Sequence, residues 1–326
     1  MAAAEAIRVE RVSKRFAEVQ AVADISFSVE RGEVFGFLGP NGAGKTTTIN
    51  MLTGLARPDS GRLLVAGHDL AGKSRRAQRH LGVVPDESNL YPELSGFANL
   101  CFCAALYGLG RAERRQRARQ LLKRLGLDEA GGRRFGGYSK GMKRKLTIAA
   151  ALIHRPEILF LDEPTTGIDV ASARQIRNLI AEQHAGGTTI FLTTHYIEEA
   201  ERLCNRIAFI VSGRIVRSDS VERLLEPLQG KHLVQITCAG GAEKAAAVLE
   251  QSFGELRLQA EAGGRLRVEA DRPVPVGSLV RHLEERGIEV LEARRRRPSL
   301  EEVFMRVTGL EAAEMNREPQ TSRRRR

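Results

Sequence analysis

The sequence predicts an α/β protein in which a largely parallel sheet forms one large domain and a smaller α+β domain follows it. Short apolar runs alternate with helical stretches, and one of these runs leads directly into a glycine-rich turn. After residue 227 the order of strands and helices changes. At 326 residues the chain exceeds the usual size of one domain, which agrees with this division.

The first part of the large domain is predicted to consist mainly of strands. Residues 7–30 alternate between apolar and polar side chains, as short half-buried strands do. An apolar strand is predicted at 34–38, and a helix at 46–55 follows the glycine-rich turn. The other apolar runs that predict strands are 63–65, 83–84, 158–161, 189–193 and 207–211.

Helical signals dominate between residues 91 and 151. Apolar residues such as Ala118, Leu122 and Leu125 recur there at helical spacing among arginines. We therefore expect a helical insert at about 87–151 within a large domain that covers residues 1–228.

The accessory domain is predicted to cover residues 229–309. A strand at 232–238, a helix at 243–251, two strands around Gly263 and Gly264, a helix near 278–285 and a strand at 288–291 give the order βαββαβ. This is the order of a ferredoxin-like fold. Ser299, with Glu302 three residues later, predicts a capped final helix, and the polar, basic tail 310–326 is predicted to be disordered.

The overall composition is that of a globular protein, with 42% hydrophobic and 28% charged residues. No run approaches the roughly 18 apolar residues of a membrane-spanning helix, and the start of the chain lacks the features of a secretory signal. We therefore expect a cytoplasmic protein that does not cross a membrane itself. The spacing of the four cysteines fits neither a metal site nor a disulfide framework; they are Cys101, Cys103, Cys204 and Cys238.

Most of the net charge of +11 comes from one segment, because residues 111–145 contain 13 basic and 3 acidic residues. Such a segment can attract phosphate-rich partners or an anionic membrane surface. A solvated helix face beside a nucleotide site would have the same composition. We favour the solvated face and expect no specific nucleic-acid binding.

A phosphate-binding loop is predicted directly after the strand at 34–38. Gly39, Gly44, Lys45 and Thr46 satisfy the pattern G-x-x-x-x-G-K-[ST], in which backbone N–H groups surround a phosphate at a helix N-terminus. The lysine would reach the β and γ phosphates and the threonine hydroxyl would bind Mg²⁺. The predicted nucleotide-binding residues of this loop are Gly39, Pro40, Asn41, Gly42, Ala43, Gly44, Lys45, Thr46 and Thr47.

Two carboxylates follow the apolar strand at 158–161. Asp162 is predicted to contribute to the Mg²⁺ site, and Glu163 to accept a proton from the attacking water. The alternative is a strand that simply ends in acidic turn residues. Since ligands bind at the carboxyl ends of parallel strands and a phosphate loop lies upstream, we favour the catalytic interpretation.

With these motifs in order, the chain resembles the ATPases of ATP-binding-cassette (ABC) transporters over about 200 residues. Residues 138–142, YSKGM, resemble the LSGGQ signature of that family, which covers the γ-phosphate bound by a second subunit. Ser139 and Gly141 match the signature, whereas Lys140 replaces its first glycine. The resemblance implies a P-loop NTPase (RecA-like) nucleotide-binding domain with an N-terminal antiparallel β subdomain, and a head-to-tail homodimer that sandwiches ATP and Mg²⁺.

Other residues are assigned through the same resemblance. Asp169 lies where the family has the D-loop that contacts the opposite subunit, and His195 where it has the γ-phosphate-sensing switch histidine. Phe16 occupies the position of an adenine-stacking aromatic, although a lone phenylalanine would more often be a core residue. Asp86 replaces the usual glutamine and is expected to remain able to bind Mg²⁺.

Residues 298–304, PSLEEVF, resemble the motif near the C-terminal end of ATPases from daunorubicin-resistance-type drug and antibiotic exporters. The resemblance therefore implies an exporter ATPase on the cytoplasmic face of the membrane, attached through a separate transmembrane permease. The main alternative is a soluble ABC ATPase that acts on nucleic acid or the ribosome, which usually carries two cassettes or a long coiled coil. A non-catalytic regulator would be expected to lack Lys45 or Glu163, and both are present.

Overall fold

The computed structural model describes residues 4–261, 263–296 and 299–309. The predicted tail 310–326 and Pro298 of the PSLEEVF motif lie outside these residues. The elements in chain order are β1 (Glu5–Phe16), β2 (Val19–Glu30), β3 (Val34–Leu38), α1 (Lys45–Leu52), β4 (Ser60–Val65), β5 (His68–Asp69), α2 (Leu70–Gln78), β6 (Leu81–Val84), α3 (Gly96–Leu106), α4 (Arg111–Arg124), η1 (Phe135–Gly137), α5 (Lys140–Leu152), β7 (Ile158–Asp162), α6 (Val170–Ala185), β8 (Thr189–Thr194), α7 (Ile197–Leu203), β9 (Arg206–Val211), β10 (Arg214–Ser220), α8 (Val221–Leu225), η2 (Glu226–Leu228), β11 (His232–Cys238), α9 (Ala242–Ser252), β12 (Arg257–Glu261), β13 (Arg265–Ala270), α10 (Val276–Glu284), β14 (Val290–Arg296) and α11 (Leu300–Thr308).

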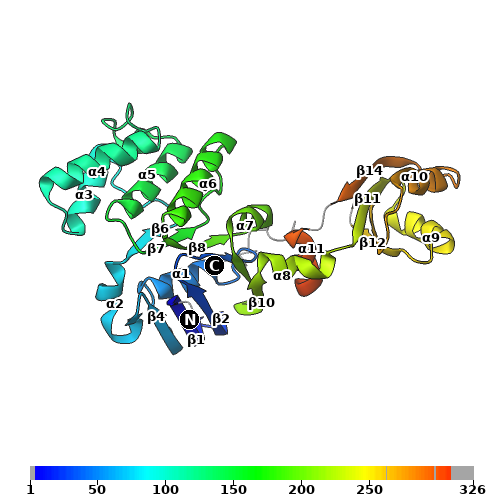
Figure 1. The fold of residues 1–326 in the computed structure, drawn as a ribbon, viewed down its shortest axis with the longest axis horizontal. Helices are drawn as coiled ribbons and strands as arrows, with labels where there is room; N and C mark the ends of the chain where they lie inside the picture. The colour runs from blue at the N-terminus through cyan, green and yellow to red at the C-terminus, as the bar shows by residue number, and fades with distance from the viewer. Residues whose placement is uncertain (1–3, 262, 297–298, 310–326) are drawn as a thin grey trace, which may run out of the picture. The chain divides into compact units, whose positions relative to one another are not determined.

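A six-stranded sheet in the order β10-β9-β3-β8-β7-β6 positions the predicted site (Figure 1). Its strands run parallel except β10, which pairs antiparallel with β9. Strands β3, β7 and β8 are buried along their whole length, which explains their continuous apolar sequences. Because β3, β7 and β8 are parallel neighbours, the residues that follow all three strands meet at one edge of the sheet.

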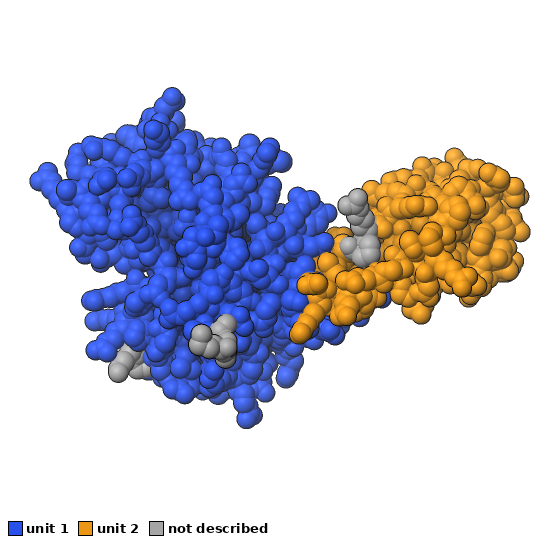
Figure 2. Space-filling view, viewed as in Figure 1, with its two compact units in different colours: residues 1–221, 304–326 blue, residues 222–303 orange. Residues whose placement is uncertain are grey.

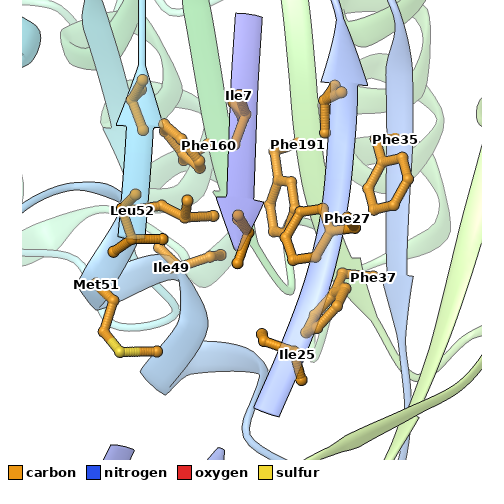
Figure 3. Packing of buried hydrophobic residues seen from close by; sticks show 14 of the residues in the cluster. Ile7, Ile25, Phe27, Phe35, Phe37, Ile49, Met51, Leu52, Phe160 and Phe191 are labelled. Carbon is orange, nitrogen blue, oxygen red and sulfur yellow. The ribbon is translucent and has the colours of Figure 1, made fainter. Parts of the chain in front are cut away.

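A second, antiparallel sheet in the order β2-β1-β4-β5 packs against the first. Phe27 of β2 stacks on Phe35 of β3, with ring centroids 5.4 Å apart, and also contacts Phe37 and Phe191. Figure 3 shows these rings between the strands, with Ile49 and Leu52 of α1 in the same core. The packing of Ile49 and Leu52 in this core holds α1, and therefore the loop before it, against the sheet.

Helices α3, α4 and α5 form the insert that the periodicity predicts, and they lie together in Figure 1. The side chains of Ser95 and Ser139 cap α3 and α5 by accepting hydrogen bonds from backbone N–H groups at the third residue beyond each. Helix α4 buries Ala118 and Leu122 and exposes most of its charged residues.

The chain divides into two compact units (Figure 2), one of residues 1–221 with the chain from 304 onward, the other of residues 222–303. In the second unit, β12-β13-β11-β14 form an antiparallel sheet, and residues of α9 and α10 pack with it in one apolar cluster. The expected boundaries, 228/229 and 309, differ from this division. In the first unit Phe304 is fully buried and packs edge to face on Phe209 of β9, with centroids 5.4 Å apart.

In the described residues, no helix combines the length and apolar character that crossing a bilayer requires.

Candidate functional site

The backbone of the loop between β3 and α1 passes so close to its neighbours that two positions admit only glycine. A Cβ on Gly39 would overlap the carbonyl oxygen of Ile210, and one on Gly44 would overlap that of Ala21. Gly44 also has φ of +106° and forms the N-cap of α1. Pro40, Ala43 and Gly44 are wholly or partly buried, whereas Asn41 and Gly42 are exposed at the rim.

Residues 45–47 begin α1, so their backbone N–H groups have no partner within the helix. Thr46 is exposed and Thr47 is half-buried. The buried ammonium of Lys45 lies over its own loop, where it donates to the carbonyl oxygens of Gly39 (2.7 Å) and Pro40 (3.2 Å). The helix dipole and these donors together make an anion-binding site.

Glu163 connects the loop to the end of β8. Its Oε1 lies 3.2 Å from Nζ of Lys45, and its Oε2 lies 2.8 Å from Nδ1 of His195. Burial by itself would raise the pKa of Glu163, but the hydrogen bond from His195 and the charge of Lys45 outweigh burial and hold the pKa below its ordinary value. The carboxylate is therefore ionised at neutral pH and able to accept a proton.

Thr193 donates to Oδ1 of Asp162 at 2.5 Å, and the hydroxyl of Thr46 also lies near this carboxylate. Burial raises the pKa of Asp162, and the two threonine hydroxyls oppose this rise. The carboxylate of Asp162 and the hydroxyl of Thr46 are suitable ligands for Mg²⁺, because proteins usually bind this ion through one or two carboxylates together with phosphate oxygens and water. In the described residues no three or more His, Cys, Asp or Glu side chains lie close enough together to hold a metal ion.

Asp86 follows β6 and is bound by a residue that the sequence analysis did not identify. The buried guanidinium of Arg144 in α5 donates to Oδ1 of Asp86 (3.2 Å) and to the carbonyl oxygens of Pro85 (2.5 Å) and Glu163 (2.9 Å). Arg144 lies in the basic segment that we interpreted as a solvated face. For this residue that interpretation was wrong, as it was for Lys145, which is also buried.

The signature-like and D-loop-like residues lie side by side in the same subunit. A Cβ on Gly141 would overlap Oγ of Ser172 and lie 2.9 Å from Oδ2 of Asp169, which caps α6. Ser139 and Lys140 are exposed. In the described chain no hydrogen bond or ion pair joins Ser139 or Gly141 to the phosphate loop.

Phe16 ends β1 with 52% of its surface exposed. The ammonium of Lys14 lies 5.3 Å from the centre of its ring. A phenylalanine that is half exposed is not a core residue, so the ring is available to stack on a flat ligand.

The sequence matches the family model described as ABC transporter over residues 22–166. The linearmycin resistance ATP-binding protein of Bacillus subtilis is 36% identical over 310 residues, which cover 93% of this chain and 98% of the relative. The chain belongs to the ABC transporter ATP-binding proteins. Daunorubicin resistance ATP-binding protein DrrA3 of Streptomyces coeruleorubidus (38%, covering 93% and 96%) and Nod factor export ATP-binding protein I of Burkholderia thailandensis (37%, covering 93% and 96%) are further relatives.

Solved structures agree with this assignment of the ABC ATPase. One described as the ATP-binding subunit of an ABC transporter has a TM-score of 0.63 and 31% identity, and covers 68% of this chain and 92% of its own. A dimeric bacterial ABC transporter cassette has a TM-score of 0.62 and 25% identity, and covers 66% and 98%. The P-loop NTPase fold is therefore confirmed, and this ABC ATPase binds and hydrolyses ATP.

Proposed function

We propose that this ABC ATPase is the motor subunit of an exporter and drives a separate membrane permease that removes small molecules from the cell. Three relatives that cover nearly the whole chain are named for resistance to linearmycin or daunorubicin, or for Nod factor export. The alternative, action on nucleic acid or ribosomes, has no comparable support. No helix in the described residues is longer than the 16 residues of α6, so a long coiled-coil arm is not present there.

The observation that carries the catalytic part of the proposal is the position of Glu163 between Lys45 and His195. Glu163 is the base that takes a proton from the attacking water. Lys45 and the N-terminus of α1 bind the β and γ phosphates, and His195 holds the carboxylate and responds to the γ-phosphate. Mg²⁺, when bound by Thr46 and Asp162 with a contribution from Asp86, would neutralise phosphate charge.

Phe16 stacks on the adenine in this proposal. A second copy of the chain completes the site, because Ser139, Lys140 and Gly141 at the start of α5 cover the γ-phosphate held by the other subunit. The exposure of Ser139 and Lys140 supports this arrangement, as does the dimeric state of a related cassette. Asp169, which lies against Gly141, contacts the opposite subunit beside the signature.

The permease docks in a cleft of about 920 Å³ in the cassette. The cleft is lined by residues of α2, by the end of α3 with the loop after it, and by the strand β6. Leu55 and Leu106 line it with 70% and 71% of their surfaces exposed, which is unusual for leucine and suits an apolar partner. Docking there would hold the protein at the cytoplasmic face of the membrane.

The second unit is an accessory domain of ferredoxin-like fold. Its elements follow the order β11-α9-β12-β13-α10-β14, and its sheet has the strand order β12-β13-β11-β14 with every neighbouring pair antiparallel. This arrangement supports the proposed fold.

The proposal is tested by purification from detergent-solubilised membranes of the native host. We expect a protein with several membrane spans to co-purify with the wild type and with Leu291→Asp, an exposed position in the second unit, but not with Leu106→Asp. Purified Leu106→Asp should keep its ATPase activity, whereas Lys45→Ala should lose ATP binding or turnover. Co-purification of ribosomes or nucleic acid without a membrane protein would favour the alternative.

A further inference from the structure

Four basic residues form a stripe along α4, and we call it the α4 stripe: Arg111, Arg115, Arg119 and Lys123. They are spaced four residues apart, so they share one face of the helix, and all four side chains are exposed. No carboxylate of the described residues lies within ion-pair distance of any of them. By contrast, Arg117 and Arg124 on the same helix pair with Glu113 and Glu182.

The stripe opposes the stability of its own helix. Like charges four residues apart repel each other, and α4 has three such pairs in succession without a compensating acid. The guanidinium groups of Arg115 and Arg119 lie 5.5 and 5.8 Å from the ring centre of Phe97 in α3. This ring attracts the two cations but carries no net charge that could neutralise them. An external anion bound at this surface would relieve the repulsion between these like charges.

The position of the α4 stripe indicates what kind of anion it binds. Arg111 follows directly after the loop 107–110, and Leu106 at the end of α3 and Tyr107 in this loop line the proposed permease cleft. Helices α3 and α4 pack side by side (Figure 1), and α3 exposes 39% of Phe102 and 71% of Leu106. Surfaces that lie on a membrane typically combine basic side chains with exposed apolar ones, and this part of the helical insert carries both.

We propose that the α4 stripe binds the headgroups of anionic phospholipids. The choice of a membrane over a nucleic acid rests on the proposed function, because the stripe adjoins the cleft assigned to a membrane permease. The stripe spans about 18 Å of helix, so it can contact several headgroups at once. Bound there, the cassette is oriented on the bilayer by its own surface in addition to the permease.

The test is co-sedimentation of the purified full chain with protein-free vesicles. We expect binding to phosphatidylcholine vesicles that contain about 30% phosphatidylglycerol, loss of binding as salt rises, and little binding to phosphatidylcholine alone. Arg115→Glu with Arg119→Glu should bind at least about tenfold more weakly, and Arg115→Lys with Arg119→Lys should bind like the wild type. The matched control, Arg214→Glu with Arg217→Glu, changes two exposed arginines of β10 and alters the net charge equally.

The proposal is overturned if the control weakens binding as much as the stripe variant does, or if neutral vesicles bind equally well. It is also overturned if double-stranded RNA displaces the vesicles and its own binding depends on the stripe. ATPase activity and thermal melting of each variant establish that the fold is intact. A wild type that binds anionic vesicles but with which no membrane protein co-purifies would refute the proposed function and leave this inference standing.

Discussion

The backbone of Glu163 shows how the surrounding residues fix one catalytic candidate. The residue has φ of +49°, in the left-handed region that residues other than glycine seldom adopt. Its N–H donates to the carbonyl oxygen of Thr193, and its own carbonyl accepts from Arg144. These bonds, together with Lys45 and His195 on the carboxylate, maintain a conformation that would otherwise be unfavourable.

We predict that Arg144→Lys lowers turnover by between about ten- and a hundredfold, because a lysine cannot hold Asp86, Pro85 and Glu163 at once and the base would shift. ATP affinity should change little, since Arg144 makes no contact with the phosphate loop in the described residues. Steady-state ATPase kinetics and nucleotide binding separate the two effects.

The control for this prediction is Arg134→Lys, an exposed arginine in the same insert. It should match the wild type in both assays. Normal turnover in Arg144→Lys would show that the carbonyl of Glu163 needs no guanidinium to hold it.

The sequence could identify residues whose spacing has chemical meaning, such as Lys45, Asp162 and Glu163. It could not identify Arg144, because a guanidinium within the run Lys143-Arg144-Lys145 is indistinguishable from solvated charge until the tertiary structure buries it. Burial depends on contacts between residues far apart in the chain. For this reason the residues around Phe16 in the sequence could not show whether its ring is exposed or belongs to the core.

At the scale of elements, strands buried on both faces were the easiest to predict. The expected strand at 34–38 coincides with β3, and those at 158–161 and 189–193 fall within β7 and β8. Their continuous apolar sequences have no helical period. Helix ends were harder: α1 ends at Leu52 rather than 55, where Gly54 with φ of +74° leaves the helix.

Packing between elements also buries much of His154, which lines the cleft beside α3. The ring of His154 stacks on Tyr107 with centroids 3.5 Å apart, and its Nε2 lies 3.0 Å from the carbonyl oxygen of Leu81. Burial lowers the pKa of His154 to about 4, from an ordinary value of 6.5. Between these values the unfolded chain takes up a proton that the folded chain does not, so stability falls as pH falls through this window and is fully retained above it.

We predict that His154→Phe removes this dependence. The free energy of unfolding of the wild type should lose at most about 2 kcal/mol more than that of the variant between about pH 7.5 and pH 5, after allowance for partial exposure of the ring. Urea unfolding at the two pH values measures the difference. His232→Phe, at an exposed position, should behave like the wild type, and parallel losses in all three proteins would exclude His154 as the cause.

For the whole molecule, the net charge of +11 predicts attraction to any polyanion without sequence preference. We expect duplex DNA to bind weakly in moderate salt and to dissociate steeply as salt rises, because such binding depends on counterion release. Fluorescence anisotropy over a salt series checks this. Tight binding that prefers one sequence or structure and stimulates ATPase activity would contradict the exporter assignment.

We propose that Glu163 is the base and that ATP joins two copies of the chain. Glu163→Gln keeps the shape of the side chain and removes its basicity, so turnover should fall by at least about a hundredfold while ATP affinity changes little. Because uncleaved ATP would then remain between the phosphate loop of one copy and Ser139 of the other, the variant should elute as a dimer with Mg-ATP and as a monomer with Mg-ADP.

Size-exclusion chromatography of Glu163→Gln, alongside an ATPase assay, measures both parts of this claim. We expect an inactive protein that is dimeric with Mg-ATP alone. A variant that hydrolyses ATP near the wild-type rate would remove Glu163 as the base, and an inactive variant that stays monomeric with Mg-ATP would contradict the sandwich in which Ser139, Lys140 and Gly141 cover the γ-phosphate.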